Sequence, residues 1–254
     1  MSRGADWFEK LSAGGTPVAG LAASVRAADA AIEGIPVRLV AVVPDAGGRF
    51  PRAQHGEVGI DEGFALARAV RGTPAGSAIL AIVDVPGQAF GIREEVVGLQ
   101  RALAASTQAY AQMRRAGHPV LALVVGKAIS GAFLAHGLQS GWIGALDDTD
   151  VEVHVMGKAA VARVTRMDEA DLARIAHEVP ATAREIAVFA RFGAIDELFA
   201  ANVTLESVRA ALAQALRDGR GLRNPIARLD TARAMETRAL AREVRARLQA
   251  AWDA

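Results

Sequence analysis

The chain has 254 residues, of which 52% are apolar and 22% charged, enough to bury a sizeable core. Its 29 basic and 28 acidic residues leave a formal net charge of +1, which gives no electrostatic footprint for nucleic acid. The absence of cysteine excludes a disulfide framework, a cysteine-ligated zinc site and thiol catalysis. No signal peptide and no run of 18 apolar residues is present, so we expect a cytoplasmic protein that does not enter a membrane.

The N-terminal residues 1–35 are rich in alanine and glycine and have weak hydrophobic periodicity. We interpret them as an N-terminal arm that contains a short helix at 21–32. Residues 36–254 contain no linker, internal repeat or low-complexity tract. We therefore expect them to form a single domain.

Nearly continuous apolar runs predict strands that are buried on both faces, at 37–43, 79–85 and 120–125. Apolar residues at helical spacing follow these runs and predict helices at 61–71, 94–116 and 130–139. Strands that alternate with helices in this way are typical of an α/β fold with parallel strands. The sequence then predicts a strand at 151–155 and a mainly helical C-terminal region, with helices at 157–164, 168–178, 181–192, 204–217 and 227–252.

Two glycine-rich turns, 84–91 and 126–133, follow the second and third predicted strands. Ligands in open α/β folds bind beyond the carboxyl ends of strands, where glycine lets backbone N–H groups approach an anionic oxygen. We expect the two turns to supply N–H donors that converge on one oxyanion. The alternative is that both are ordinary strand-to-helix turns, which are also often rich in glycine.

Other ligand-binding motifs are missing from the sequence. No G-x-G-x-x-G follows a strand, and Gly126-Lys127 lacks both the earlier glycine and the following Ser or Thr of a P-loop. The five histidines include no H-x-x-x-H pair, so we predict no metal site. His136 stands among apolar residues of a predicted helix, and we expect it to be a hydrogen-bonded core histidine.

Lysine is rare in this sequence, and arginine supplies most of the 29 basic side chains. Lys127 and Lys158 each lie in a Gly-Lys-Ala segment between a predicted strand and a predicted helix. A lysine in this position adds positive charge to N–H donors that point at an anion, so both are candidates to bind a phosphate or a carboxylate. The alternative is a solvated side chain.

Three motifs that occur in order make the sequence similar to a known family. They are Asp84-Val85-Pro86-Gly87 with Gly91 and Glu94-Glu95 after it, the run from Gly126-Lys127 through Ser130-Gly131-Ala132-Phe133, and Phe192-Gly193-Ala194-Ile195-Asp196-Glu197. Over residues 35–200 the chain resembles the carboxyltransferase branch of the crotonase superfamily, and most closely the family of malonate decarboxylase gamma subunits. That resemblance implies an α/β, crotonase-like (ClpP/crotonase) superhelix of ββα units with a helical C-terminal region.

The resemblance also implies a role in a multisubunit, biotin-independent decarboxylase. Beta and gamma subunits of that family convert the malonyl thioester of an acyl carrier subunit into an acetyl thioester and CO2, and a separate acyl-transferase subunit reloads the carrier. The prosthetic group is a phosphoribosyl-dephospho-CoA arm on the carrier, so no cofactor and no biotin is expected on this chain. We expect a heterodimer with a beta subunit, and no binding to nucleic acid or membranes.

The same resemblance implies a catalytic site built mainly from backbone. Loss of CO2 from a malonyl thioester leaves an enolate whose charge sits on the thioester oxygen, and two preorganised N–H groups stabilise that charge. The family pattern places these donors on the amides of Gly87, Gln88, Gly131 and Ala132, with Ser130 beside them. The two lysines, Lys127 and Lys158, would then bind the anionic substrate arm.

Departures from the family pattern leave other functions open. Gln88 stands where biotin-linked carboxyltransferases have Phe, and Ser130-Gly131 replaces Gly-Gly, which argues against carboxybiotin binding. The chain could instead be a non-catalytic scaffold that completes the active site of the beta subunit. The segment around Ser130 also resembles the nucleophile loop of the Clp protease family, with His154 and either Asp168 or Asp171 as candidate triad partners, so a serine hydrolase is a third reading.

Overall fold

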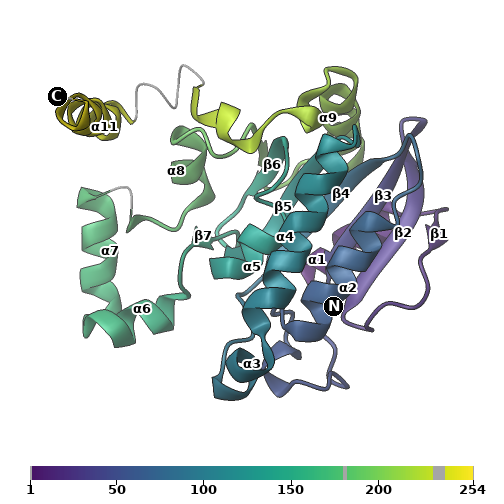
Figure 1. The fold of residues 1–254 in the computed structure, drawn as a ribbon, viewed down its shortest axis with the longest axis horizontal. Helices are drawn as coiled ribbons and strands as arrows, with labels where there is room; N and C mark the ends of the chain where they lie inside the picture. The colour runs from purple at the N-terminus through teal and green to yellow at the C-terminus, as the bar shows by residue number, and fades with distance from the viewer. Residues whose placement is uncertain (1, 180–181, 231–237, 254) are drawn as a thin grey trace.

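The fold is that of a computed structural model, which describes residues 2–179, 182–230 and 238–253 (Figure 1). Its strands form a mixed sheet in the order β1-β2-β3-β4-β5-β6-β8, and β7 pairs with β5. The first three strands pair antiparallel, whereas the pairs from β3 onward are parallel. The strands are β1 Thr16–Pro17, β2 Val25–Ile32, β3 Ile35–Val42, β4 Ala78–Val85, β5 Val120–Ile129, β6 Trp142–Asp147, β7 Val153–His154 and β8 Glu197–Ala200.

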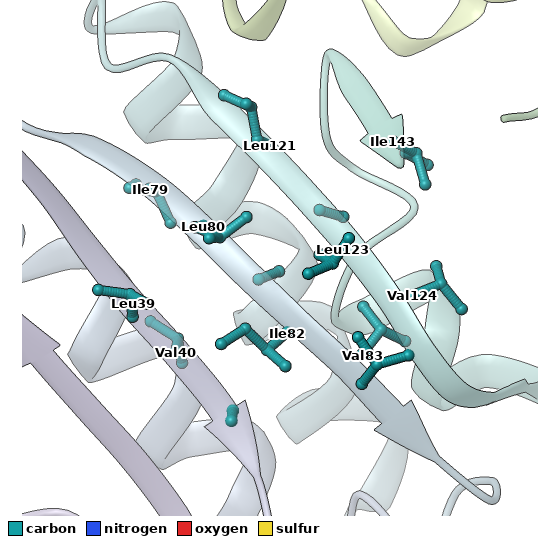
Figure 2. Close-up of a cluster of buried hydrophobic side chains, with 14 of the residues drawn as sticks. Leu39, Val40, Ile79, Leu80, Ile82, Val83, Leu121, Leu123, Val124 and Ile143 are labelled. Carbon is teal, nitrogen blue, oxygen red and sulfur yellow. The ribbon is translucent and has the colours of Figure 1, made fainter. Parts of the chain in front are cut away.

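The apolar runs that predict buried strands form the centre of this sheet, as β3, β4 and β5. Every residue of β4 except Asp84 is buried. Figure 2 shows how Leu39, Ile82 and Leu123, one from each strand, lie within one continuous apolar cluster. Because burying such a side chain contributes about 1.5–3 kcal/mol, this cluster holds the parallel register firmly. The three predicted strands are therefore confirmed.

Helices cover both faces of the sheet (Figure 1). Helix α1 Arg3–Leu11 packs against the central strands on one face. Helices α2 Ile60–Arg71 and α4 Leu99–Arg115 lie side by side on the other face. Helix α9 Leu205–Arg217 contacts β2 and α1. The central strands thus lie between two helical layers.

The other helices are short or peripheral. They are α3 Ile92–Val97, α5 Ser130–Ala135, α6 Lys158–Thr165, α7 Glu169–Glu178, α8 Ile186–Arg191 and α11 Ala239–Trp252, with 3-10 turns at Pro51–Ala53, Arg220–Leu222 and Pro225–Asp230. Helix α11 lies away from the sheet, and none of its residues is buried (Figure 1). None of the helices in the described ranges is both long and apolar enough to cross a membrane.

The N-terminal residues differ from the sequence-based interpretation. The helix expected at 21–32 is wrong, because residues 25–32 form β2 and pair with β3 through Ile32 and Ile35. Glu33 and Gly34, with φ of 49° and 78°, make the tight turn whose twist favours such a hairpin. Strand pairing here overrides the helical preference of an alanine-rich segment. Side chains of α1 and β2 belong to the same core as the central strands, so residues 1–35 are not a separate arm.

Several other predicted elements change at their ends. The helix predicted at 94–116 is interrupted at Gly98, where φ is 113°, and forms α3 and α4. Helix α1 and the short strands β6 and β8 are not predicted from the sequence; β6 has six residues and β8 has four. The helix predicted at 227–252 includes residues 231–237, which lie outside the described residues, and its last part is α11.

Candidate active site

The two glycine-rich turns meet because they follow neighbouring parallel strands. Strands β4 and β5 stay paired as far as Val85 and Ala128, so the segments after them leave the same edge of the sheet. The carboxylate of Asp84 fixes this edge by accepting hydrogen bonds from the backbone N–H of Gly4 at 2.9 Å and of Lys127 at 3.1 Å. Asp84 therefore ties α1, β4 and β5 together and serves as a structural residue.

The side chain of Gln88 joins the first turn to the second. Its Oε1 accepts a hydrogen bond from the backbone N–H of Gly131 at 2.8 Å and another from the Ser130 hydroxyl at 2.9 Å. A Cβ on residue 131 would lie 2.4 Å from the same oxygen, so this close approach requires glycine. The sequence predicts only a backbone role for Gln88, although a polar residue in place of Phe was the available signal for a role of its side chain.

Ser130 begins α5 in a strained conformation. Its φ of 61° lies in the left-handed region, which residues other than glycine seldom adopt. Such strain costs of order 1–3 kcal/mol and persists only where surrounding contacts fix it. The hydrogen bond from the Ser130 hydroxyl to Gln88 is one such contact.

The segment that carries Gly87 and Gln88 is anchored through Val58. The Val58 N–H donates to the Gly87 carbonyl at 3.0 Å, and the Ala89 N–H donates to the Val58 carbonyl at 3.0 Å. Because backbone groups alternate in direction along an extended segment, the Gln88 N–H faces away from Val58. Within the described parts of the chain, no hydrogen bond satisfies the amides of Gly87 and Gln88.

The four predicted backbone donors thus differ in their surroundings. The Gly131 N–H is already paired with the side chain of Gln88. The amides of Gly87 and Gln88 have no partner among the described residues, and Ala132 is completely buried within α5. The structure therefore brings the two predicted turns together. Their use as oxyanion donors stays a prediction.

Gln88, Ser130 and Gly131 form one wall of a cavity of about 440 Å3. The rest of its lining is mostly apolar, as is usual for sites that bind small molecules through a few placed polar groups. A second cavity of about 690 Å3 lies beneath α6 and α7, and His154 lines both. The other residues that line the smaller cavity are Phe133, Leu134, Leu138, Val153, Val155 and Phe189.

The candidate hydrolase triad is not assembled. The Ser130 hydroxyl donates to Gln88, and Nδ1 of His154 faces the backbone of Met156, 3.0 Å from its carbonyl oxygen and 3.2 Å from its nitrogen. Burial, together with the charge of Arg184, lowers the pKa of His154. Asp168 caps α7, where it accepts from the Asp171 N–H at 2.8 Å, and Asp171 pairs with Arg174. Neither carboxylate orients His154 in the described residues.

Of the two candidate lysines, only Lys127 has a described side chain. Lys127 is on β5 with an exposed side chain, and its backbone N–H bonds to Asp84. Lys158 begins α6, and its side chain lies outside the described part of the structure. Lys127 is not among the described residues that line the cavity beside Gln88. Their role toward an anionic arm stays a prediction.

His136 is a core residue, as expected. Its Nε2 lies 2.9 Å from the Ile82 carbonyl, which can only accept, so the ring proton sits on Nε2 and Nδ1 accepts from the Tyr110 hydroxyl at 2.9 Å. Both side chains are fully buried. Burial lowers the pKa of His136 to about 4 and raises the pKa of Tyr110. The described residues contain no group of His, Asp and Glu suited to holding a metal ion.

The chain resembles known proteins in sequence and in fold. A family model described as the malonate decarboxylase gamma subunit matches residues 53–252. The malonyl-S-ACP:biotin-protein carboxyltransferase of Malonomonas rubra is 37% identical over 161 residues, which cover 59% of this chain. The chain thus spans about half the length of this relative, 55%.

Solved structures of similar proteins cover nearly all of the chain. A Pseudomonas malonate decarboxylase hetero-tetramer in complex with coenzyme A contains a chain that is 44% identical, with a TM-score of 0.85 over 97% of this chain and 100% of that one. The Pseudomonas MdcD-MdcE hetero-dimer gives 44% identity and a TM-score of 0.82, covering 99% and 100%. A transcarboxylase 12S chain, 24% identical, has a TM-score of 0.65 over 84% of this chain and 39% of its own length. The predicted crotonase-like α/β fold is confirmed.

Proposed function

The chain belongs to the malonate decarboxylase gamma subunit family, and on that premise we propose that it acts with a beta subunit to decarboxylate malonyl-S-acyl carrier protein. The products are acetyl-S-acyl carrier protein and CO2. The observation that carries this proposal is the 44% identity to a malonate decarboxylase chain over 97% of this chain and 100% of the other. A match over both full lengths supports a shared role better than one that covers half of a longer relative.

The position of the two turns at one edge of the sheet supports the proposed chemistry. When the bond between the carboxylate carbon and the α-carbon breaks, its electron pair moves onto the thioester oxygen and CO2 leaves. The enolate then takes a proton at the α-carbon, which yields the acetyl thioester. Backbone N–H groups of Gly87, Gln88 and Ala132 are the proposed donors, because that of Gly131 is paired with the Gln88 side chain. The mostly apolar cavity beside Gln88 strengthens such donors by excluding water.

The prosthetic arm belongs to a partner in this proposal. A phosphoribosyl-dephospho-CoA arm on the carrier delivers the malonyl group, and an acyl-transferase subunit reloads it. This chain would hold no cofactor of its own. The exposed Lys127, together with Lys158, would attract the phosphates of the arm at long range, while the apolar lining beside Gln88 fits its thioester end. The proposal keeps the cytoplasmic location expected from the sequence.

The apolar residues that the chain leaves exposed fit a large partner interface. Helix α11 carries Leu240, Val244, Leu248 and Trp252, spaced four residues apart along one exposed face. Ile92 and Val96 of α3 are also exposed. A face of this kind is typical of a surface that a partner covers. We assign these faces to the beta subunit because the Pseudomonas relative is a chain of a hetero-dimer.

A second candidate function is carboxyl transfer to a biotin protein, which the name of the Malonomonas rubra relative describes for that protein. Gln88 and Ser130 argue against it here, since biotin-linked carboxyltransferases resembled by this chain have Phe and Gly at these places. A third is a scaffold that only completes the site of the beta subunit. The hydrogen bond from Gly131 to Gln88 favours that reading, because it occupies one predicted donor.

The test is to purify the chain with the beta subunit of its own source and supply malonyl carrier with avidin present. We expect co-elution on a sizing column, release of CO2 that avidin does not inhibit, and no label on an added biotin protein. Leu248→Glu should weaken co-elution, whereas Arg245→Glu on the same exposed helix should not. Separate elution of the two unmodified subunits at micromolar concentration contradicts the proposed assembly, and transfer of label to biotin favours the second function.

A further inference from the structure

The carboxamide of Gln88 has a fixed orientation. An amide N–H can only donate, so the Gln88 atom that faces the Gly131 nitrogen at 2.8 Å must be the carbonyl oxygen, Oε1. The Ser130 hydroxyl donates to the same oxygen at 2.9 Å. Two donors on one oxygen leave a single orientation for the whole group. The NH2 group, Nε2, therefore points away from Ser130 and Gly131.

This NH2 group is available to a ligand. No residue in the described ranges accepts a hydrogen bond from Nε2, and Gln88 is half-buried in the wall of the cavity of about 440 Å3. A carboxamide whose oxygen accepts two hydrogen bonds is polarised, and its N–H groups become better donors. The cavity provides few other polar groups, since most of the residues that line it are apolar.

We propose that the side-chain NH2 of Gln88 is an oxyanion donor that contacts the carbonyl oxygen of an acyl thioester. It takes over the role of the Gly131 N–H, whose acceptor position is occupied by the Gln88 oxygen. Gly131 and Ser130 are then positioning residues that hold and polarise the carboxamide. This inference rests on the proposed function, which supplies the acyl thioester.

The variants Gln88→Glu and Gln88→Ala distinguish donation by the Gln88 NH2 group from a role in which Gln88 only blocks the Gly131 N–H. Glutamate keeps the shape and both acceptor contacts but removes the NH2 donors and adds a negative charge. Alanine removes the whole group and exposes the Gly131 N–H. Loss of one oxyanion donor lowers kcat by about 10²–10³. We expect Gln88→Glu to lower kcat at least a hundredfold and Gln88→Ala at least tenfold, with smaller changes in KM for the malonyl carrier.

The matched control is Gln108→Glu, which makes the same charge change on the exposed surface of α4, where the Gln108 oxygen accepts from Arg71. We expect its kinetics to match those of the unmodified complex. A second readout does not depend on decarboxylation: the infrared carbonyl stretch of acetyl-CoA, labelled with 13C at the carbonyl, bound to the assembled complex. The frequency should fall on binding, and the fall should shrink in both Gln88 variants but not in Gln108→Glu.

These outcomes are distinguishable from failure of the proposed function. A complex that does not decarboxylate malonyl carrier but still shows the Gln88-dependent carbonyl shift removes the proposed function and supports the donor. A Gln88→Ala complex with activity equal to or above that of the unmodified protein overturns the donor role, because Gln88 then only blocks the Gly131 N–H. An unchanged carbonyl frequency in both Gln88 variants, or no binding of acetyl-CoA, overturns it as well.

Discussion

The side-chain oxygen of Gln88 lies 2.8 Å from the backbone nitrogen of Gly131, where an oxyanion bound to that amide would lie. The two residues come from turns 43 positions apart in the sequence, and the parallel pairing of β4 with β5 brings them together. The Gln88 oxygen thus occupies the Gly131 N–H, which is one of the predicted oxyanion donors. The functional question is therefore how this contact acts once a thioester is present.

Gly131→Val should abolish decarboxylation in the assembled complex, by at least a hundredfold in kcat. The new Cβ would lie 2.4 Å from Gln88 Oε1, so the carboxamide must move and its contact with residue 131 is lost. Steady-state kinetics with malonyl carrier measure the effect, with co-elution as the check on assembly. Gly47→Ala is the control, since its Cβ meets only Asp45 at 3.4 Å. Wild-type kinetics for Gly131→Val contradict a role for this contact.

Ser130→Ala should keep most of the activity, within about tenfold of the unmodified complex. The change removes one hydrogen bond to Gln88, typically worth about 0.5–1.5 kcal/mol, and leaves the Gly131 bond in place. A fluorophosphonate probe should not label Ser130, because His154 does not contact its hydroxyl in the described structure. A loss above a hundredfold with normal assembly, or labelling at Ser130, supports the serine-hydrolase reading instead.

The sequence predicts where the two turns meet but not the contact between Gln88 and Gly131. The runs in β3, β4 and β5 predict the sheet and the edge where the turns meet, because buried apolar strands leave a plain signal. The role of Gln88 could not be predicted in the same way, since a side-chain hydrogen bond to Gly131 depends on the three-dimensional placement of two distant turns. The strand β2 was missed because its alanines favour a helix and only pairing decides against it.

Lys127→Ala should reduce kcat/KM for the malonyl carrier by no more than about fivefold at low salt, and by less at high salt. From the sequence alone we expect about tenfold, but the side chain is exposed, and an exposed charge contributes roughly 0–1 kcal/mol. Kinetics at several ionic strengths measure this effect. Lys10→Ala, which removes the same charge from α1, is the control. A loss above tenfold that salt does not change contradicts long-range attraction and indicates a direct contact.

The buried His136 should make the protein less stable in acid. Its pKa is about 4 when folded and near 6.5 when unfolded, so between these values the unfolded chain binds the extra proton. Stability is therefore lost as pH falls from about 6.5 to about 4. The loss between pH 7 and pH 5 is of order 2 kcal/mol from this group.

Urea unfolding at pH 7 and pH 5 measures that loss of stability. Comparison with a variant that lacks His136 removes the contribution of the other titrating groups. His136→Gln can keep a donor toward Ile82 and an acceptor for Tyr110 while removing the titration. Its stability should fall less between the two pH values than that of the unmodified chain. His177→Gln, at an exposed position, should behave like the unmodified chain. An equal pH dependence in all three proteins contradicts the assigned cause.

The central claim, that this chain helps to form the site where a malonyl thioester loses CO2, is tested most directly by the initial rate of acetyl-carrier formation. The rate is measured for the beta subunit alone, for the complex with this chain, and for the complex with Gly131→Val. We predict that the unmodified complex is at least a hundredfold faster than the other two. A beta subunit that is equally fast alone, or a Gly131→Val complex that is as fast as the unmodified one, would contradict the claim.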